Sequence, residues 1–236
     1  TIGGLINYFH TVPWNLERSG ARVYSASVSF VNSSEQRGQQ LANYINGLGE
    51  SKVNIMAHSQ GAPTPRVTAS LIPHKVASVT SINGVNKGSR VADVARGILP
   101  PGSYVEGGVS AIANALGDLV NALSDADNPQ DGVAALETLT TRGTTQLNDA
   151  LGVWINGHKI KFFSWTGTAV WTNWTDITDP FLGVTTLAFG NEPNDGLVGE
   201  CSTKMGNVIG THYEMNHVDA INHLFGARSW RTDPIS

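Results

Sequence analysis

The sequence has few of the features that mark disulfide-rich, nucleic-acid-binding or membrane-spanning proteins. Cys201 is the only cysteine among 236 residues, so no disulfide can form within the chain, and we expect its thiol to be packed rather than reactive. Only 14% of residues are charged and the formal net charge is −4, which argues against a nucleic-acid partner. Apolar runs are short compared with the roughly 20 residues that cross a bilayer, so stable membrane insertion is not expected.

Enough apolar residues are present for a sizeable core. Hydrophobic residues make up 40% of the chain, and its length fits one α/β domain, which we expect to span residues 1–236. The chain begins at Thr1 without an initiator methionine or a signal-like segment. We interpret it as a mature or truncated product from which any targeting segment is gone.

Strand and helix patterns alternate through the first ninety or so positions. The apolar spacing predicts strands over residues 22–28, 52–57 and 76–82, with helices over 35–48 and 65–71 between them. This order is typical of an α/β fold with a mostly parallel central sheet flanked by helices.

The middle of the chain has a different pattern. One apolar stripe recurs at spacings of three and four, as on one face of a helix: Val109, Ile112, Leu116, Leu119, Val120 and Leu123. By periodicity alone, a core helix is the favoured interpretation. A second helix is expected over 133–139, and late strands over 159–165 and 185–189.

Ser59 lies between the predicted strand 52–57 and the helix that follows it. Ala57 and Gly61 stand two positions to either side, and small residues there allow the sharp strand-to-helix turn that presents a nucleophile in α/β-hydrolases. An ordinary serine in a turn is the alternative interpretation. Pro63 and Pro65 are compatible with the start of a helix, where an N–H group has no partner within the helix.

A serine nucleophile needs a histidine base and a carboxylate that orients it, and the hydrolase fold supplies them in the order Ser, Asp, His. His58 and His74 come too early for this order. The late histidines are His158, His212, His217 and His223, and the candidate acids are Asp176, Asp179 and Asp195. The spacing of these residues alone leaves the choice among them open.

Several separated segments together resemble the family I bacterial triacylglycerol lipases of the Pseudomonas, Burkholderia and Proteus type, which are α/β-hydrolases. The matching segments occur in the order typical of that family across nearly the whole chain. They are residues 37–41, 52–61, 76–84, 194–199 and 215–219.

The resemblance implies a catalytic triad. By position, Ser59 is the nucleophile, Asp195 the acid and His217 the general base, and the backbone N–H of Gln60 is one oxyanion-hole donor. The implied reaction is ester hydrolysis through an acyl-enzyme.

The resemblance also implies one structural calcium ion and a lid. Asp179 and Asp219 match the carboxylate ligands, and His223 and Ala227 match the positions that bind through backbone carbonyls. The helical stripe lies where the family has its lid, within an insertion of about residues 97–140. The resemblance therefore favours a mobile cover over the substrate cleft rather than a core helix.

The chain departs from the family pattern at three places. The partner of Cys201 in the family disulfide is missing, which puts dependence on a membrane-anchored foldase in doubt. The first strand, with its His-Gly oxyanion loop, would precede Thr1. By the same resemblance, the family's closing C-terminal helix would come after Ser236.

The resemblance therefore implies a secreted, monomeric lipase that acts on lipid esters at oil-water interfaces. Two alternatives stay open at this stage. One is an esterase for short-chain soluble esters, and the other is a catalytically impaired hydrolase-fold fragment or binding module.

Overall fold

The computed structural model describes residues 8–29, 32–98, 108, 111–112, 114, 132–156, 159–223 and 226–232. The α-helices are α1 (Val12–Arg18), α2 (Ser34–Gly47), α3 (Pro63–Leu71), α4 (Arg90–Ala95), α6 (Gly132–Leu139), α7 (Thr141–Asn156), α8 (Asp179–Thr185) and α9 (Glu200–Thr203). The strands are β1 (Val53–His58), β2 (Val76–Ile82), β3 (Lys161–Gly167) and β4 (Asn207–Tyr213). Short 3-10 helices are η1 (Ser59–Gly61), η2 (Pro73–Lys75), η3 (Thr186–Phe189) and η4 (Asp219–Ile221).

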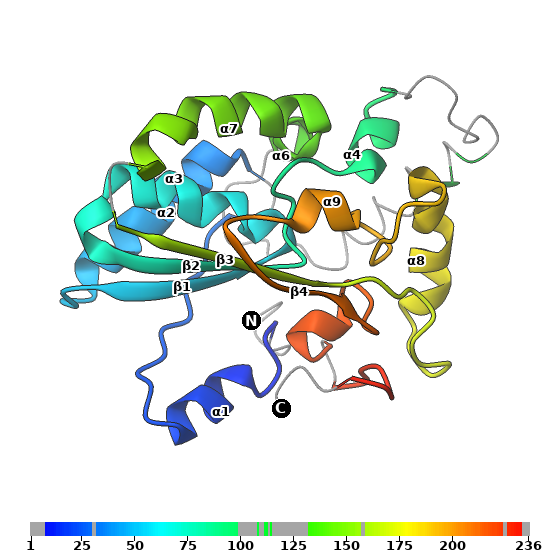
Figure 1. Cartoon of the computed structure of the whole chain (residues 1–236), viewed down its shortest axis with the longest axis horizontal. Coiled ribbons are helices and arrows are strands. Elements are labelled where there is room, and N and C mark those ends of the chain that lie inside the picture. The colour runs from blue at the N-terminus through cyan, green and yellow to red at the C-terminus, as the bar shows by residue number, and fades with distance from the viewer. Residues whose placement is uncertain are drawn as a thin grey trace.

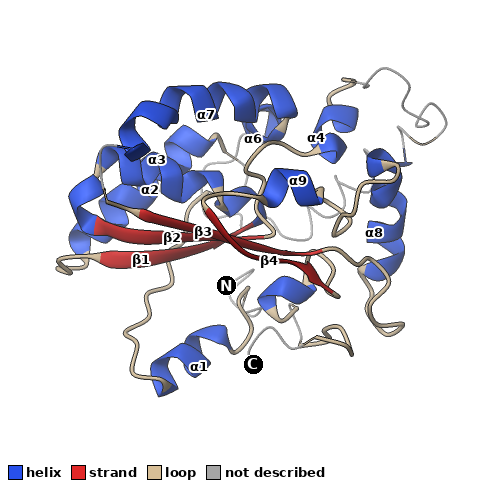
Figure 2. Cartoon of the chain, viewed as in Figure 1, coloured by secondary structure: helices blue, strands red, loops and turns tan. Residues whose placement is uncertain are grey.

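The four strands form one sheet in the order β1-β2-β3-β4, and every pair is parallel (Figure 2). Parallel strands place their carboxyl ends at the same edge of a sheet, which is where α/β proteins carry their functional loops. The turn after β1 and the loop after β2 therefore open at this edge, as does the loop after β3.

Helices cover the sheet unevenly. In Figure 1, α2, α3 and α7 lie above the sheet, and α1 lies below it. The apolar stripe of α2 explains its position, because Leu41, Ala42 and Ile45 are buried in a cluster with Ile72. The apolar face of α2 therefore packs inward, next to Val53 and Ile55 of β1.

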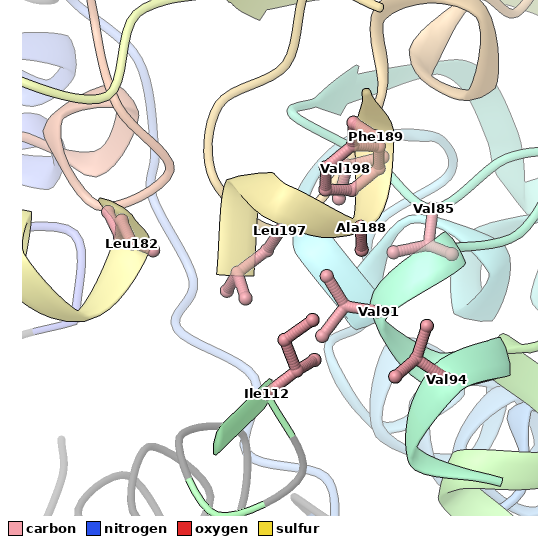
Figure 3. Packing of buried hydrophobic residues seen from close by; sticks show 9 residues of the cluster. All are labelled: Val85, Val91, Val94, Ile112, Leu182, Ala188, Phe189, Leu197 and Val198. Carbon is pink, nitrogen blue, oxygen red and sulfur yellow. The ribbon is translucent and has the colours of Figure 1, made fainter. Parts of the chain in front are cut away.

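A second cluster joins segments that are distant in the sequence (Figure 3). It contains Val85, Val91, Val94, Ile112, Leu182, Ala188, Phe189, Leu197 and Val198. Leu197 and Val198 lie two and three residues after Asp195. The apolar core therefore anchors the turn that carries this acid.

Most elements expected in the first half of the chain are confirmed. The helix expected over 35–48 is α2, and the strand expected over 76–82 is β2. The strand expected over 52–57 is β1 and the helix over 65–71 is α3, each with small shifts of the ends.

The strand expected over residues 22–28 is not formed. Among the described residues, this segment pairs with no strand: β1 lies at the edge of the sheet, and its one hydrogen-bonded neighbour is β2. Its residues are mostly exposed, so the alternation of side chains in the sequence is not matched by a buried face.

The strand expected over 185–189 is also wrong. Thr185 ends α8, and η3 continues directly from it. In a strand, residues 187 and 189 would share a face, yet Leu187 is 59% exposed and Phe189 is 2% exposed. The apolar run is therefore buried by helical geometry.

Later elements agree in part with expectation. The strand expected over 159–165 is β3, shifted by two residues, and the helix expected over 133–139 is α6. The strand β4 was not predicted. Cys201 is exposed, which contradicts the expectation of a packed thiol, because it lies in the short helix α9 at the protein surface.

The insertion expected at about 97–140 falls mostly outside the described residues. Of its apolar stripe, Ile112 is described, and it is helical and completely buried. Within the described part of the chain, no helix is both long and apolar enough to cross a membrane.

Candidate active site

Ser59 occupies a sharp turn at the carboxyl end of β1. Its φ of 56° lies in the left-handed region, which a residue with a side chain adopts at a cost of about 1–3 kcal/mol. The Ser59 carbonyl compensates by accepting hydrogen bonds from Ala62 N (3.0 Å) and Val85 N (3.2 Å). The turn is therefore held in a strained form that presents the Ser59 side chain between β1 and α3.

His217 links Ser59 to Asp195. Its Nε2 lies 2.7 Å from Ser59 Oγ, and its Nδ1 lies 2.8 Å from Asp195 Oδ2. A carboxylate only accepts, so Nδ1 carries the proton and Nε2 is free to accept one from the hydroxyl. The histidine is 4% exposed and the aspartate is completely buried. The geometry is that of a nucleophile, a base and an orienting acid.

The acid is fixed by its own turn. Asp195 Oδ1 accepts hydrogen bonds from Leu197 N (2.9 Å) and Val198 N (2.7 Å), which leaves Oδ2 to face His217. Gly196 has φ of 99°, and a Cβ there would lie 2.7 Å from Cβ of Leu182. This position therefore requires glycine both for its backbone conformation and for its packing.

The other candidate bases and acids lie elsewhere. His212 is exposed, and His223 is buried against Asp176, with Nε2 3.0 Å from Oδ1. His158 lies outside the described residues. Among the described late histidines, only His217 contacts Ser59.

The backbone N–H of Gln60 has no hydrogen-bond acceptor among the described residues, so it is available to an oxyanion beside Ser59. Arg37, on α2, reaches the same turn, and its Nη1 donates to the Gln60 carbonyl at 3.4 Å. Burial lowers the pKa of Arg37 to about 10, while the nearby Tyr8 acts in the opposite direction. The buried guanidinium of Arg37 therefore holds the backbone of this turn from the side of α2.

Asp179 and Asp219, the expected calcium ligands, lie in one buried polar cluster with Asp176 and Asn216. The amide nitrogen of Asn216 donates to Asp176 Oδ2 (2.8 Å) and Asp179 Oδ1 (2.9 Å), and its Oδ1 accepts from the Asp219 backbone N–H (2.8 Å). Asn216 directly precedes His217. The acidic cluster is thus tied to the loop that carries the histidine.

The carbonyl positions expected to complete the calcium site are His223, which is buried, and Ala227, which is partly buried. Among the described residues, no group of three or more His, Cys, Asp or Glu side chains has the geometry to hold a metal ion. The expected site uses only two carboxylates, since its other protein ligands are backbone carbonyls.

Four residues around the site were not assigned a role from the sequence: Tyr8, Arg37, His58 and Asn216. Arg37, His58 and Asn216 lie inside the segments that carry the family resemblance, which was the available signal. Tyr8 lies outside them. Its side chain is half-buried and hydrogen-bonded to His58, a contact that only the folded chain reveals.

Comparison with known proteins identifies the family. A triacylglycerol lipase of Vibrio cholerae is 45% identical over 254 residues, which cover 100% of this chain and 80% of the relative. The chain belongs to the bacterial triacylglycerol lipase family. A second member, from Burkholderia plantarii, is 32% identical and covers 98% of this chain and 78% of the relative. No model from a collection of protein families matches the chain.

Solved structures agree with this assignment at the level of the fold. The crystal structure of mature lipase BlEst2 from Bacillus licheniformis superposes with a TM-score of 0.60 at 20% identity, covering 83% of this chain and 71% of that one. The expected α/β-hydrolase fold is thereby confirmed. The family resemblance noted in the sequence is confirmed by the curated relatives.

Proposed function

We propose that the protein is a triacylglycerol lipase that uses Ser59 as nucleophile, His217 as general base and Asp195 as the orienting acid. The observation that carries this proposal is the continuous hydrogen-bonded series from Ser59 Oγ through His217 to Asp195 Oδ2, in a member of the lipase family. Partners in such a series act as one unit, because loss of any member disables proton transfer.

The reaction follows from these positions. Ser59 Oγ attacks the ester carbonyl while His217 Nε2 takes its proton. Asp195 stabilises the imidazolium through Nδ1. The negative oxygen that develops on the carbonyl accepts a hydrogen bond from Gln60 N–H. His217 then donates the proton to the departing alcohol. A water molecule, deprotonated by the same nitrogen, attacks the acyl carbonyl, and His217 returns the proton to Ser59 Oγ as the fatty acid leaves.

Turnover of two substrates tests both the chemistry and the substrate class. We expect Ser59→Ala to abolish hydrolysis of p-nitrophenyl butyrate and of emulsified triolein, while Ser51→Ala, at an exposed serine, keeps wild-type rates. Asp195→Asn should lower kcat by about 10⁴-fold, because an amide favours the wrong imidazole tautomer. Equal rates for Ser59→Ala and wild type would refute the mechanism. Hydrolysis of the soluble ester alone would make the protein an esterase.

We also propose that one calcium ion binds between Asp179 and Asp219, with backbone carbonyls of His223 and Ala227 completing its protein ligands. Both carboxylates are buried, and burial raises the pKa of Asp219, as does the nearby charge of Asp176. A divalent cation would offset this cost of burying negative charge.

The hydrogen bonding of the two carboxylates is compatible with such an ion. Asp179 Oδ2 accepts from two backbone N–H groups, and Asp219 Oδ2 accepts from Asn216 N and the Thr172 hydroxyl. Each Oδ1 accepts one hydrogen bond from the described residues, from Asn216 Nδ2 and Ser229 N respectively. One lone pair on each Oδ1 is therefore available to a cation.

Thermal unfolding tests the calcium proposal. Calcium added to protein that has been treated with a chelator should raise Tm, because binding increases the free energy of unfolding by RT ln(1 + [L]/Kd). Magnesium should have a smaller effect. Asp219→Asn should remove the calcium response, and Asp149→Asn, at an exposed position, should retain it. A Tm that does not change on chelation or on calcium addition would contradict the proposal.

Family membership supports the remaining expectations. We propose that the protein is secreted, acts as a monomer at lipid-water interfaces, and folds without a dedicated foldase, since Cys201 has no cysteine partner in the chain. Active, monomeric enzyme after expression without a foldase gene would agree with this. A requirement for a co-expressed foldase would contradict it.

A further inference from the structure

His58, the residue before the nucleophile, lies at the meeting point of three segments that are far apart in the sequence. Its Nε2 is 2.8 Å from the backbone carbonyl of His217, and its Nδ1 is 2.7 Å from the hydroxyl of Tyr8. Its side chain is 5% exposed. A buried imidazole with both nitrogens bonded is held in a single orientation.

The partners of His58 determine its tautomer. A backbone carbonyl can only accept, so His58 Nε2 carries the proton and donates it to His217 O. Its Nδ1 then has a lone pair, and the Tyr8 hydroxyl must donate to it. The Tyr8 hydroxyl thus satisfies the Nδ1 lone pair of the tautomer that holds the backbone of His217.

Both backbone polar groups of His217 are bound by segments that carry the other two members of the triad. His217 N–H donates to the Asp195 carbonyl at 2.9 Å, and His217 C=O accepts from His58. His217 lies in a turn between β4 and η4, outside regular secondary structure. The hydrogen bonds of a strand or helix therefore do not fix its backbone, and these two contacts do.

His58 must also stay uncharged for this arrangement to suit catalysis. The imidazole centroids of His58 and His217 are 4.5 Å apart, and His217 gains a positive charge during the reaction. Burial holds the pKa of His58 well below its ordinary value, and the neighbouring His217 acts in the same direction. A neutral donor can thus approach the base without adding a like charge.

We propose that His58, oriented by Tyr8, is a positioning residue that holds the backbone of His217 so that its Nε2 stays within hydrogen-bond distance of Ser59 Oγ. This role rests on the proposed function of His217 as the general base. It assigns no contact with substrate to His58.

Steady-state kinetics on a soluble ester tests the proposal with three variants of the whole chain. His58→Leu removes the donor and should lower kcat by about 10- to 100-fold, with KM within about twofold of wild type, because a small displacement of the base affects the chemical step. His58→Gln supplies an amide N–H donor and should restore most of kcat. Tyr8→Phe should lower kcat by a smaller factor than His58→Leu does. His74→Leu, at an exposed histidine, serves as the matched control and should match wild type.

The three variants separate positioning from general stabilisation. A purely structural role predicts that kcat follows thermal stability in every variant, with no rescue by His58→Gln at equal Tm, and this result would overturn the proposal. A wild-type kcat in His58→Leu would also overturn it. Should His58→Leu fail to fold, Tyr8→Phe decides, because it removes one hydroxyl and leaves the imidazole in place: reduced kcat at unchanged KM supports the proposal, and unchanged kcat refutes it.

Wild type and Ser59→Ala in the same assay distinguish this inference from the proposed function. If Ser59→Ala is as active as wild type, the triad itself is wrong and the role of His58 is wrong with it. If only Ser59→Ala loses activity and the His58 and Tyr8 variants do not, the triad stands and the positioning role alone is refuted.

Discussion

The contact between α2 and α3 at Gly38 allows a sharp prediction about how the nucleophile turn is supported. A Cβ built at Gly38 would overlap the side chain of Val67 and lie 3.3 Å from the Thr64 carbonyl oxygen. Val67 is β-branched, so its rotamer in a helix is nearly fixed and it cannot turn aside. The neighbouring Arg37 binds the Gln60 carbonyl, and α3 begins three residues later, at Pro63. The distance between the two helices therefore affects the position of the turn that carries Ser59.

We expect Gly38→Ala to destabilise the protein although alanine favours helices. The higher helix propensity of alanine contributes up to about 1 kcal/mol, whereas overpacking a core typically costs about 1–3 kcal/mol. Because the built Cβ would lie 2.5 Å from the Val67 Cβ, we expect a cost at the upper end, about 2–3 kcal/mol, and hence a net loss of about 1–2 kcal/mol. At this chain length, about 1 kcal/mol corresponds to roughly 2–4 °C in Tm, so Tm should fall by about 2–8 °C in a thermal unfolding experiment.

Gly47 in the same helix provides the control. No atom lies within 4 Å of a Cβ built there, so Gly47→Ala should leave Tm unchanged or raise it slightly. The double variant Gly38→Ala/Val67→Ala should lose less stability than the sum of the two single variants, because removal of the valine methyl groups relieves the overlap. Equal or higher Tm in Gly38→Ala, or strict additivity with Val67→Ala, would refute the reasoning.

Three further predictions follow from single residues. His58 stays neutral in the folded protein, so only the unfolded chain binds a proton at this residue as pH falls through about 6.5. The contribution of His58 to the free energy of unfolding should therefore be complete above that pH and should decrease by about 1 kcal/mol per pH unit below it. Urea denaturation at pH 7.5 and 5.5 should show a smaller decline in His58→Gln. Gly61→Ala should keep ester turnover, since its Cβ would lie 3.7 Å from that of Ala57, and a large loss of kcat would contradict this. Exposed Cys201 should react with a thiol reagent in the native protein, and Cys201→Ser should keep wild-type activity.

The parts of the fold that sequence patterns predicted are those in which local periodicity and burial agree. The helix α2 has its apolar residues at helical spacing, and they are buried against the sheet. The strand β2 has a short apolar run flanked by turn residues, and it lies between two neighbours in the sheet. In both elements, the type of element and its buried face could be predicted from the local sequence alone.

The parts that could not be predicted depend on partners distant in the chain. Residues 22–28 alternate as a strand should, yet a strand also needs a paired neighbour, which the pattern cannot supply. The strand β4 contains Gly210 and has mostly exposed residues, so its signal is weak until β3 is beside it. The contact of His58 with His217 joins residues 159 positions apart, and no spacing rule indicates it.

Asp195 contacts His217 although the strand expected over residues 185–189 is absent. That segment is helical, since Thr185 ends α8 and η3 follows it. The position of its carboxylate comes from the turn itself: two backbone N–H groups bind Oδ1, Asp195 N–H donates to the Val198 carbonyl at 3.2 Å, and Gly196 supplies the positive φ. The apolar side chains of Leu197 and Val198 then attach this turn to the core. Short-range turn chemistry and burial, rather than the preceding strand, therefore determine where the acid meets the base.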